Sequence, residues 1–88
     1  MKLIKIGAIW CSGCLIMNKV ISKTLKNYSF DYVEYDLDMD PEASSYEVGD
    51  VLPVFIVMEQ DREITRFSGE YSYEEFVHRL KEAGVIHE

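Results

Sequence analysis

Cysteine is scarce in this sequence. The 88 residues include two, Cys11 and Cys14, and only two positions separate them. Cysteines so close together cannot link distant parts of a chain, which excludes the disulfide scaffold of small secreted domains. With so few residues the chain has room for one domain, residues 1–88, and one modest core.

Basic residues and long apolar stretches are also few. Nine lysines and arginines against 16 acidic residues give a net charge of −7, which argues against nucleic acid and anionic membranes as partners. No apolar stretch approaches the roughly 18 residues that a membrane helix needs. The apolar start is too short for a secretion signal and is interrupted by Lys5. We therefore expect a cytoplasmic protein.

The hydrophobic pattern predicts four strands and three helices. Strands are expected at residues 2–9, 30–35, 54–58 and 62–67, and helices at 12–26, 41–47 and 72–84. Ser72 and Glu75 fit a capping box at the start of the last helix, and Gly84 is expected to end it. The runs at 2–9 and 54–58 are almost wholly apolar, as in strands buried on both faces. A hairpin-length connection joins the last two strands, so that pair should be antiparallel. The first helix is expected to bury one face, made of Leu15, Ile16, Met17, Val20, Ile21 and Leu25.

Both cysteines lie where the first strand passes into the first helix. Thiols at positions i and i+3 of a helical turn are neighbours, close enough to form a disulfide after a small adjustment. The helix N-terminus favours a thiolate on Cys11, whereas Cys14 lies further in and should be less exposed. The spacing therefore predicts a redox dithiol with Cys11 as nucleophile and Cys14 as resolving thiol.

The main alternative for these cysteines is a metal site. A structural zinc ion needs four ligands, and the sequence adds only His78 and His87, far along the chain. We expect no metal and no bound cofactor. A non-catalytic module that senses redox state or passes on a metal stays open as a second class of function.

Acidic residues after the second strand imitate a calcium loop. They are Asp36, Asp38, Asp40 and Glu47. The loop needs glycine at its sixth position for a sharp turn, and that position is Pro41 here. We interpret this segment as a solvated acidic turn that leads into a short helix, with Asp40 as N-cap.

Several stretches together resemble the thioredoxin superfamily. They are Trp10-Cys11-Ser12-Gly13-Cys14, the acidic turn 36–41, the segment 48–53 that ends in Leu52-Pro53, and Gly69 before the last helix. The resemblance covers nearly the whole chain. It implies an α/β thioredoxin fold in a minimal form, with a four-stranded mixed sheet flanked by helices.

The resemblance also implies a substrate site. In that family the proline is cis and faces the dithiol, and a glycine lines the substrate groove. Pro53 and Gly69 match those positions, Leu52 would pair with the substrate backbone, and Trp10 would contact the substrate. The implied activity is thiol–disulfide exchange with protein disulfides, after which a reductase of the thioredoxin type reduces the Cys11–Cys14 disulfide. A glutathione-coupled, glutaredoxin-like protein is the alternative, although Glu70 adds an acid where glutathione would need basic groups.

Lys5 departs from the family pattern. Thioredoxins carry a buried acid six residues before the first cysteine, and Lys5 takes that place here. One interpretation is that its stem packs on the sheet while the ammonium reaches water or pairs with an acid. The other is that Lys5 stays near Cys14 and lowers the pKa of that thiol electrostatically. Lys5 is therefore a candidate for tuning the resolving thiol.

Overall fold

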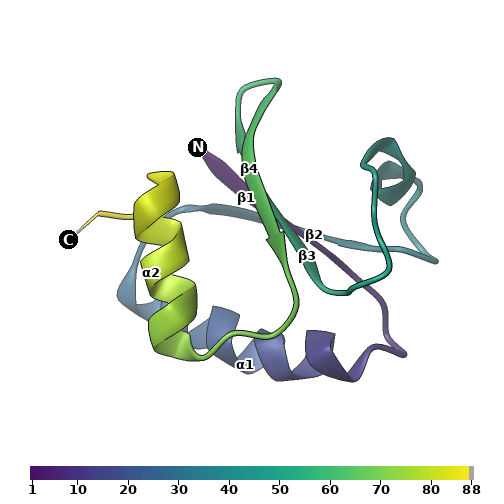
Figure 1. The fold of residues 1–88 in the computed structure, drawn as a ribbon, viewed down its shortest axis with the longest axis horizontal. Coiled ribbons are helices and arrows are strands. Elements are labelled where there is room, and N and C mark those ends of the chain that lie inside the picture. The colour runs from purple at the N-terminus through teal and green to yellow at the C-terminus, as the bar shows by residue number, and fades with distance from the viewer. Residues whose placement is uncertain (88) are drawn as a thin grey trace.

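The computed structural model describes residues 1–87, and its elements follow the predicted order (Figure 1). They are β1 (Lys2–Gly7), α1 (Ser12–Asn27), β2 (Asp31–Asp36), the 3₁₀ helix η1 (Pro41–Ser45), β3 (Val54–Glu59), β4 (Arg62–Ser68) and α2 (Tyr73–Ala83). The first strand ends at Gly7, two residues before the predicted end.

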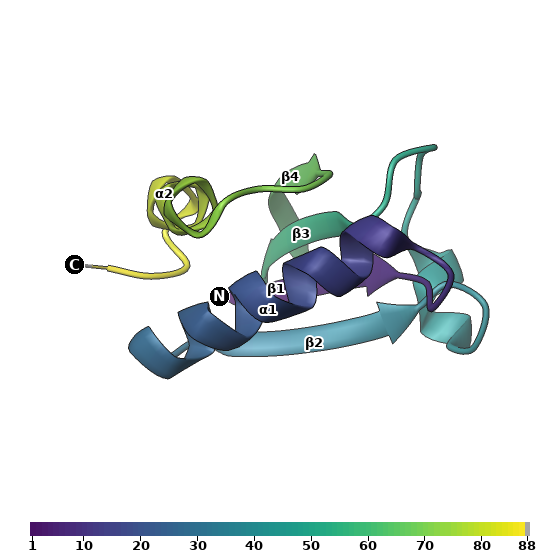
Figure 2. The ribbon, with the colours of Figure 1, turned by 90° about the horizontal axis from the view of Figure 1, so that it is seen from below.

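The four strands form one mixed sheet in the order β2-β1-β3-β4. Figure 2 shows this order, with β2 at the bottom and β4 at the top. β1 pairs in parallel with β2 and antiparallel with β3, and β3 pairs antiparallel with β4. The predicted α/β class and mixed sheet are confirmed. The most apolar strands, β1 and β3, are the central ones.

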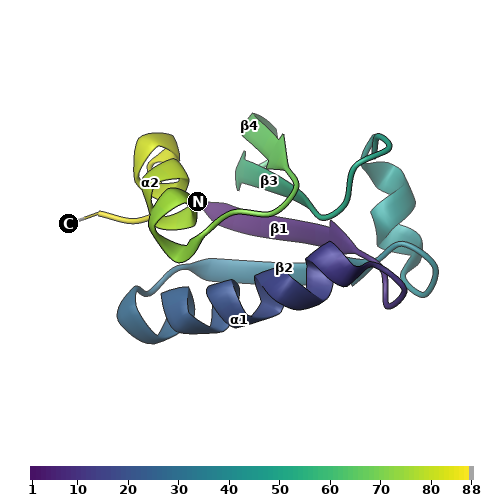
Figure 3. The same cartoon turned by 60° about the horizontal axis from the view of Figure 1, so that its bottom comes forward.

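Both α-helices cover the same face of the sheet. Met17 and Ile21 of α1 and Phe76 and Leu80 of α2 share one apolar cluster with strand residues such as Phe55. Figure 3 shows α1 running along the near side of the strands. This packing holds the N-terminal turn of α1, which carries the cysteines, against the end of β1.

The opposite face of the sheet packs against a smaller set of side chains. Ile4, Ile6 and Ile56 pack there on Ala43 of η1, with Tyr46 at the edge. The predicted helix to Glu47 is shorter than expected and of the 3₁₀ type. The Asp40 side chain does not cap it and instead accepts a hydrogen bond of 2.7 Å from the Asp36 N–H. A five-residue 3₁₀ helix suffices because the strand side chains on this face form a cluster of only a few residues.

The buried face of α1 is narrower than predicted. Leu15, Ile16 and Leu25 are exposed. The buried positions are Gly13, Cys14, Met17, Ile21 and Thr24. Positions three and four apart form one line on a helix, and only that line meets the sheet.

Helix α2 begins and ends where the sequence predicts. The Ser72 hydroxyl and the Glu75 carboxylate each accept a 3.2 Å hydrogen bond from the other residue's backbone N–H. At the other end Gly84 adopts a left-handed conformation, φ 85°, which favours glycine. The capping box fixes the start of α2 just after residues 69–71, which approach the dithiol.

Candidate active site

The two cysteines occupy different positions at the start of α1. Cys11 is the N-cap residue, and its Sγ accepts a hydrogen bond of 3.3 Å from the Cys14 N–H. Cys14 is 3% exposed and Cys11 is 9% exposed, and both are free thiols. The N-terminal end of a helix and an amide donor both favour negative charge on the Cys11 sulfur.

Cys14 fits into its place because residue 7 has no side chain. A Cβ atom added to Gly7 would lie 2.7 Å from Cys14 Sγ, closer than real Cβ contacts allow. The same point lies 3.6 Å from Lys5 Cε. The Cys14 thiol and the end of the Lys5 side chain therefore flank Gly7 on the helix-covered face of the sheet.

The surroundings of Cys14 keep this thiol protonated. Burial raises the pKa of Cys14 to about 11, and a hydrogen bond with Cys11 adds to the rise. A hydrogen bond from the Ala8 backbone and the positive charge of Lys5 both act to lower this pKa, but they are outweighed. Near neutral pH the Cys14 thiol is therefore a poor nucleophile until its surroundings change.

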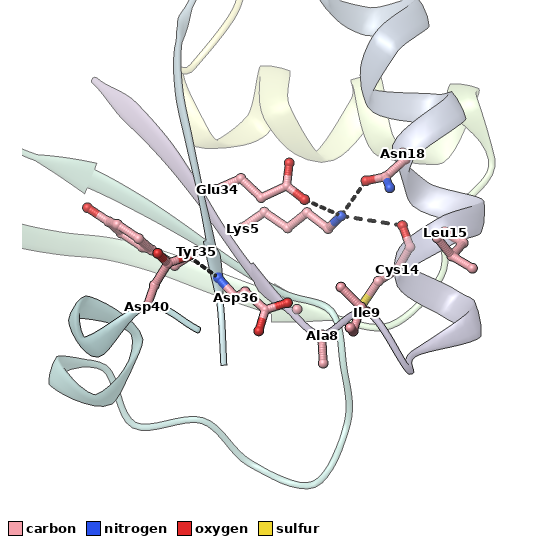
Figure 4. Close-up of a pocket in the computed structure, with 11 residues that line it drawn as sticks. Lys5, Ala8, Ile9, Cys14, Leu15, Asn18, Glu34, Tyr35, Asp36 and Asp40 are labelled. Carbon is pink, nitrogen blue, oxygen red and sulfur yellow. Dashed lines mark hydrogen bonds and ion pairs between the residues drawn. The ribbon is translucent and has the colours of Figure 1, made fainter. Parts of the chain in front are cut away.

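Lys5 is buried and fully hydrogen-bonded. Its Nζ donates to Asn18 Oδ1 at 2.5 Å, to Glu34 Oε1 at 3.1 Å and to the Cys14 carbonyl oxygen at 3.3 Å. Figure 4 shows these bonds converging on the ammonium. Three acceptors match the three N–H donors of the charged form. The side chain is 1% exposed, so the ammonium pairs with an acid and does not reach water.

The cleft in Figure 4 runs from Cys14 to the edge of the sheet. It has a volume of about 390 Å³ and lies between α1 and β2. Asn18 and Glu34 line it beside Lys5. Glu34 is about half exposed and also accepts a hydrogen bond of 3.3 Å from the Tyr32 hydroxyl. Burial raises the pKa of that hydroxyl, and the Glu34 charge adds to the rise. The Lys5–Glu34 pair thus connects the interior to the surface.

The segment before β3 lies against the dithiol. The Leu52–Pro53 peptide bond is cis, as the resemblance implies. Leu52 packs against the cluster of Ala8, Cys11 and Cys14. Gly69 donates a hydrogen bond of 2.9 Å from its N–H to the Pro53 carbonyl and adopts φ 98°, which favours glycine. The structure therefore places Leu52 against the cysteines and ties Gly69 to the same segment through Pro53.

Trp10 lies on the surface and is held in place from the acidic turn. Its side chain is 66% exposed, and Nε1 donates a hydrogen bond of 2.7 Å to Asp38 Oδ2. Asp36 accepts hydrogen bonds from the N–H groups of Asp38 and Met39. These aspartates hold the turn and Trp10. Among residues 1–87 no group of three or more acidic, histidine or cysteine residues is placed to hold a metal ion.

Exposed apolar side chains occur on the segments that carry or approach the dithiol. They are Ile9, Trp10, Leu15, Ile16 and Val51, each at least half exposed. They come from the loop before α1, from its first turn and from the segment before Pro53. Exposed apolar groups gathered around a reactive site mark a surface that contacts another molecule.

The comparisons with known proteins agree with this geometry. The family model described as thioredoxin matches residues 1–82. The chain belongs to the thioredoxin family. A search of the curated proteins gives no match. Membership of the family supports thiol–disulfide oxidoreductase chemistry in general terms, and thioredoxins act on protein disulfides together with a reductase.

Solved thioredoxins share the fold. Reduced thioredoxin pre-protein of Schistosoma mansoni superposes with a TM-score of 0.79 at 21% identity, covering 92% of this chain and 76% of that one. Thioredoxin 1 of Thermosipho africanus gives 0.74 at 24% identity, covering 93% and 92%. The Fasciola hepatica thioredoxin gives 0.70 at 26% identity, covering 96% and 79%. In the part of the chain that the structure describes, no helix is long and apolar enough to cross a membrane.

Within this thioredoxin fold, sequence reasoning missed three residues around Cys14. They are Gly7, Asn18 and Glu34. The alternation of β1 places Gly7 and Lys5 on one face, and this was a usable signal for Gly7. Glu34 lies opposite Lys5 in the parallel pairing of β1 and β2. That register, and the contact with Asn18, cannot be deduced from the residue pattern.

Proposed function

We propose that the protein is a thiol–disulfide oxidoreductase that reduces protein disulfides through Cys11 and Cys14. The observation that supports this most is the asymmetry of the pair. Cys11 caps α1 and accepts an amide hydrogen bond, whereas Cys14 is buried and has its pKa raised to about 11. One sulfur suits attack on a substrate, and the other suits a delayed second step.

The reaction has two exchange steps. The Cys11 thiolate attacks one sulfur of the substrate disulfide, forms a mixed disulfide and displaces the other substrate sulfur as a thiolate. Cys14 then loses its proton and attacks Cys11 Sγ, which forms the Cys11–Cys14 disulfide and releases the second substrate thiolate. Two electrons pass to the substrate, and its two thiolates take up protons from water.

The substrate chain would lie across Leu52, Pro53 and Gly69. We assign backbone pairing with the substrate to Leu52, because it packs on the cysteines just before β3 begins. Trp10 would contact the substrate from the other side. The exposed apolar residues near the dithiol support this placement of the substrate, because exposed apolar groups mark sites that contact another molecule.

We assign Lys5 a role in tuning the second step. Its charge lowers the pKa of Cys14 against the larger effect of burial. An acid placed near a buried thiol can accept its proton, but a lysine with three acceptors around its ammonium cannot. Lys5 would instead stabilise the Cys14 thiolate as it forms, while water in the cleft beside it carries the proton away.

A thioredoxin-type reductase is the proposed electron donor. Glutathione is the second candidate, because the cytoplasm, where we place the reaction, contains both systems. The acids near the dithiol argue against glutathione, which carries two carboxylates. A redox sensor that never turns over is the remaining alternative, since the same pair of thiols could serve it.

One experiment separates these functions. Reduction of insulin disulfides is followed with NADPH and a thioredoxin reductase, and in parallel with NADPH, glutathione and glutathione reductase. We expect turnover with the thioredoxin reductase and little with glutathione. Turnover only with glutathione would indicate a glutathione-coupled, glutaredoxin-like protein. Turnover with neither reductant would indicate a redox sensor. A Cys11→Ser variant is the control for the background rate.

A further inference from the structure

Glu70 lies directly over the dithiol loop. It follows Gly69 in the connection between β4 and α2. A Cβ atom added to Gly13 would lie 3.2 Å from Glu70 Cγ, 3.3 Å from its Oε2 and 3.4 Å from the Leu52 carbonyl oxygen. A carboxylate and a backbone carbonyl therefore lie together at Gly13, one of the two residues between the cysteines.

Both groups at this point only accept hydrogen bonds. An ionised carboxylate has no donor, and neither has a carbonyl. Within residues 1–87, no hydrogen bond or ion pair of the Glu70 side chain is found, and the side chain is exposed. Glu70 is thus an exposed, unpaired negative charge at the place where the substrate would lie.

The surrounding surface has the same character. Ile9, Trp10 and Val51 offer apolar contacts, and Asp38 adds a second carboxylate behind Trp10. Lys5, the basic residue at the dithiol, is buried and faces Glu34 in the interior. The charge presented outward at this site is therefore negative.

We propose that Glu70 determines substrate specificity by selecting protein disulfides that carry a basic side chain beside the attacked cysteine. This inference rests on the proposed function. A lysine or arginine next to that cysteine would reach Glu70 when the substrate backbone lies along Leu52. Arginine fits best, because its fork of donors can serve the carboxylate and the carbonyl together. An acidic neighbour would face Glu70 as a like charge.

The test uses two peptides with an internal disulfide that differ only in arginine or glutamate beside the attacked cysteine. Pre-reduced protein is mixed with each peptide in a single turnover, and peptide reduction is followed by chromatography. We expect the arginine peptide to react about three- to fivefold faster, as an exposed ion pair would give. The preference should shrink in about 0.5 M salt, where the Debye length is only a few ångströms.

Three variants decide the assignment. Glu70→Gln should bring the rate ratio close to one, and Glu70→Lys should invert it. Glu59→Gln, at the far end of β3, makes the same chemical change away from the dithiol and should keep the wild-type ratio. The ratio also cancels any general effect on Cys11, because both peptides meet the same thiol.

Two results would overturn the proposal in different ways. If wild-type protein reduces both peptides equally, or if Glu70→Gln keeps the preference, Glu70 does not determine specificity while the oxidoreductase function stands. If wild-type protein reduces neither peptide nor insulin, the proposed function fails and this inference fails with it.

Discussion

The two sides of the dithiol have opposite character. Outside, around Cys11, the surface is apolar and negative, and Trp10 is held by Asp38. Inside, around Cys14, the chain buries a cation that three acceptors hold in place. In the proposed function, the outer side contacts the substrate and the inner side tunes the pKa of Cys14. We therefore expect substrate choice and the timing of release to be controlled by different residues.

The largest effect should come from exchanging the cysteines themselves. We expect Cys14→Ser to accumulate a mixed disulfide with the substrate, because the sulfur that resolves it is gone. Cys11→Ser should show no such adduct and no turnover, since the buried Cys14 has a raised pKa. Mass spectrometry of the protein after incubation with insulin measures both. Equal adducts in the two variants would remove the distinction between the outer and the inner sulfur.

Gly7→Ala tests how tightly the inner side is packed. The added Cβ would lie 2.7 Å from Cys14 Sγ, so the sulfur or the strand must move. We expect the free energy of unfolding to fall by about 1–3 kcal/mol, the usual cost of overpacking. Urea denaturation of the reduced protein measures it.

Gly49→Ala is the matched control for this change. A Cβ atom at Gly49 meets nothing within 4 Å, so its effect should stay within about 0.5 kcal/mol. If both variants unfold at the same urea concentration, the close approach of Gly7 and Cys14 does not constrain the fold.

Lys5→Met tests the inner charge. The substitution keeps the length of the stem and removes the ammonium. In a Cys11→Ser background burial still raises the pKa of Cys14, and Lys5→Met should raise it further, because a positive charge that lowers it is lost. Thiolate absorbance in the ultraviolet, followed against pH, measures this pKa.

The same variant should slow the release of the mixed disulfide. Release requires the Cys14 thiolate, so its rate rises with pH until the pKa is passed. Near neutral pH we expect the rate of release to fall by less than about tenfold. A rise of one unit in the pKa of Cys14 would lower the thiolate fraction tenfold, and we expect a smaller rise. Lys19→Met, an exposed lysine on α1, makes the same change in net charge and should leave the rate unchanged. An unaltered pKa in Lys5→Met would make Lys5 a packing residue.

The smallest effect is expected on the outer side. Trp10→Phe keeps most of the apolar contact and removes the hydrogen bond to Asp38. Since this bond is exposed, we expect a loss of about 0.5–1 kcal/mol in stability. A double-mutant cycle with Asp38→Asn isolates the coupling between the two side chains. Coupling indistinguishable from zero would mean that Trp10 is not held by the acidic turn.

The sequence alone determined the fold class, the order of the elements and the pair of cysteines. Apolar runs of strand length specified β1 and β3, and Ser72, Glu75 and Gly84 fixed both ends of α2. These features depend on neighbours within a few residues, so a residue pattern carries them. The buried face of α1 was predicted too wide and η1 too long, because both depend on how much of the sheet each element covers.

Only the tertiary structure decided what surrounds the two sulfurs. The pairing of β1 with β2 sets Glu34 opposite Lys5, and the packing of α1 on the sheet brings Asn18 within reach of the same ammonium. The connection after β4 places Glu70 over Gly13, 57 positions away in the chain. Such contacts arise when separate segments pack together, and strand register and helix placement leave no mark on the local sequence. Local pattern therefore specified the reactive thiols, and packing specified the charges that act on them.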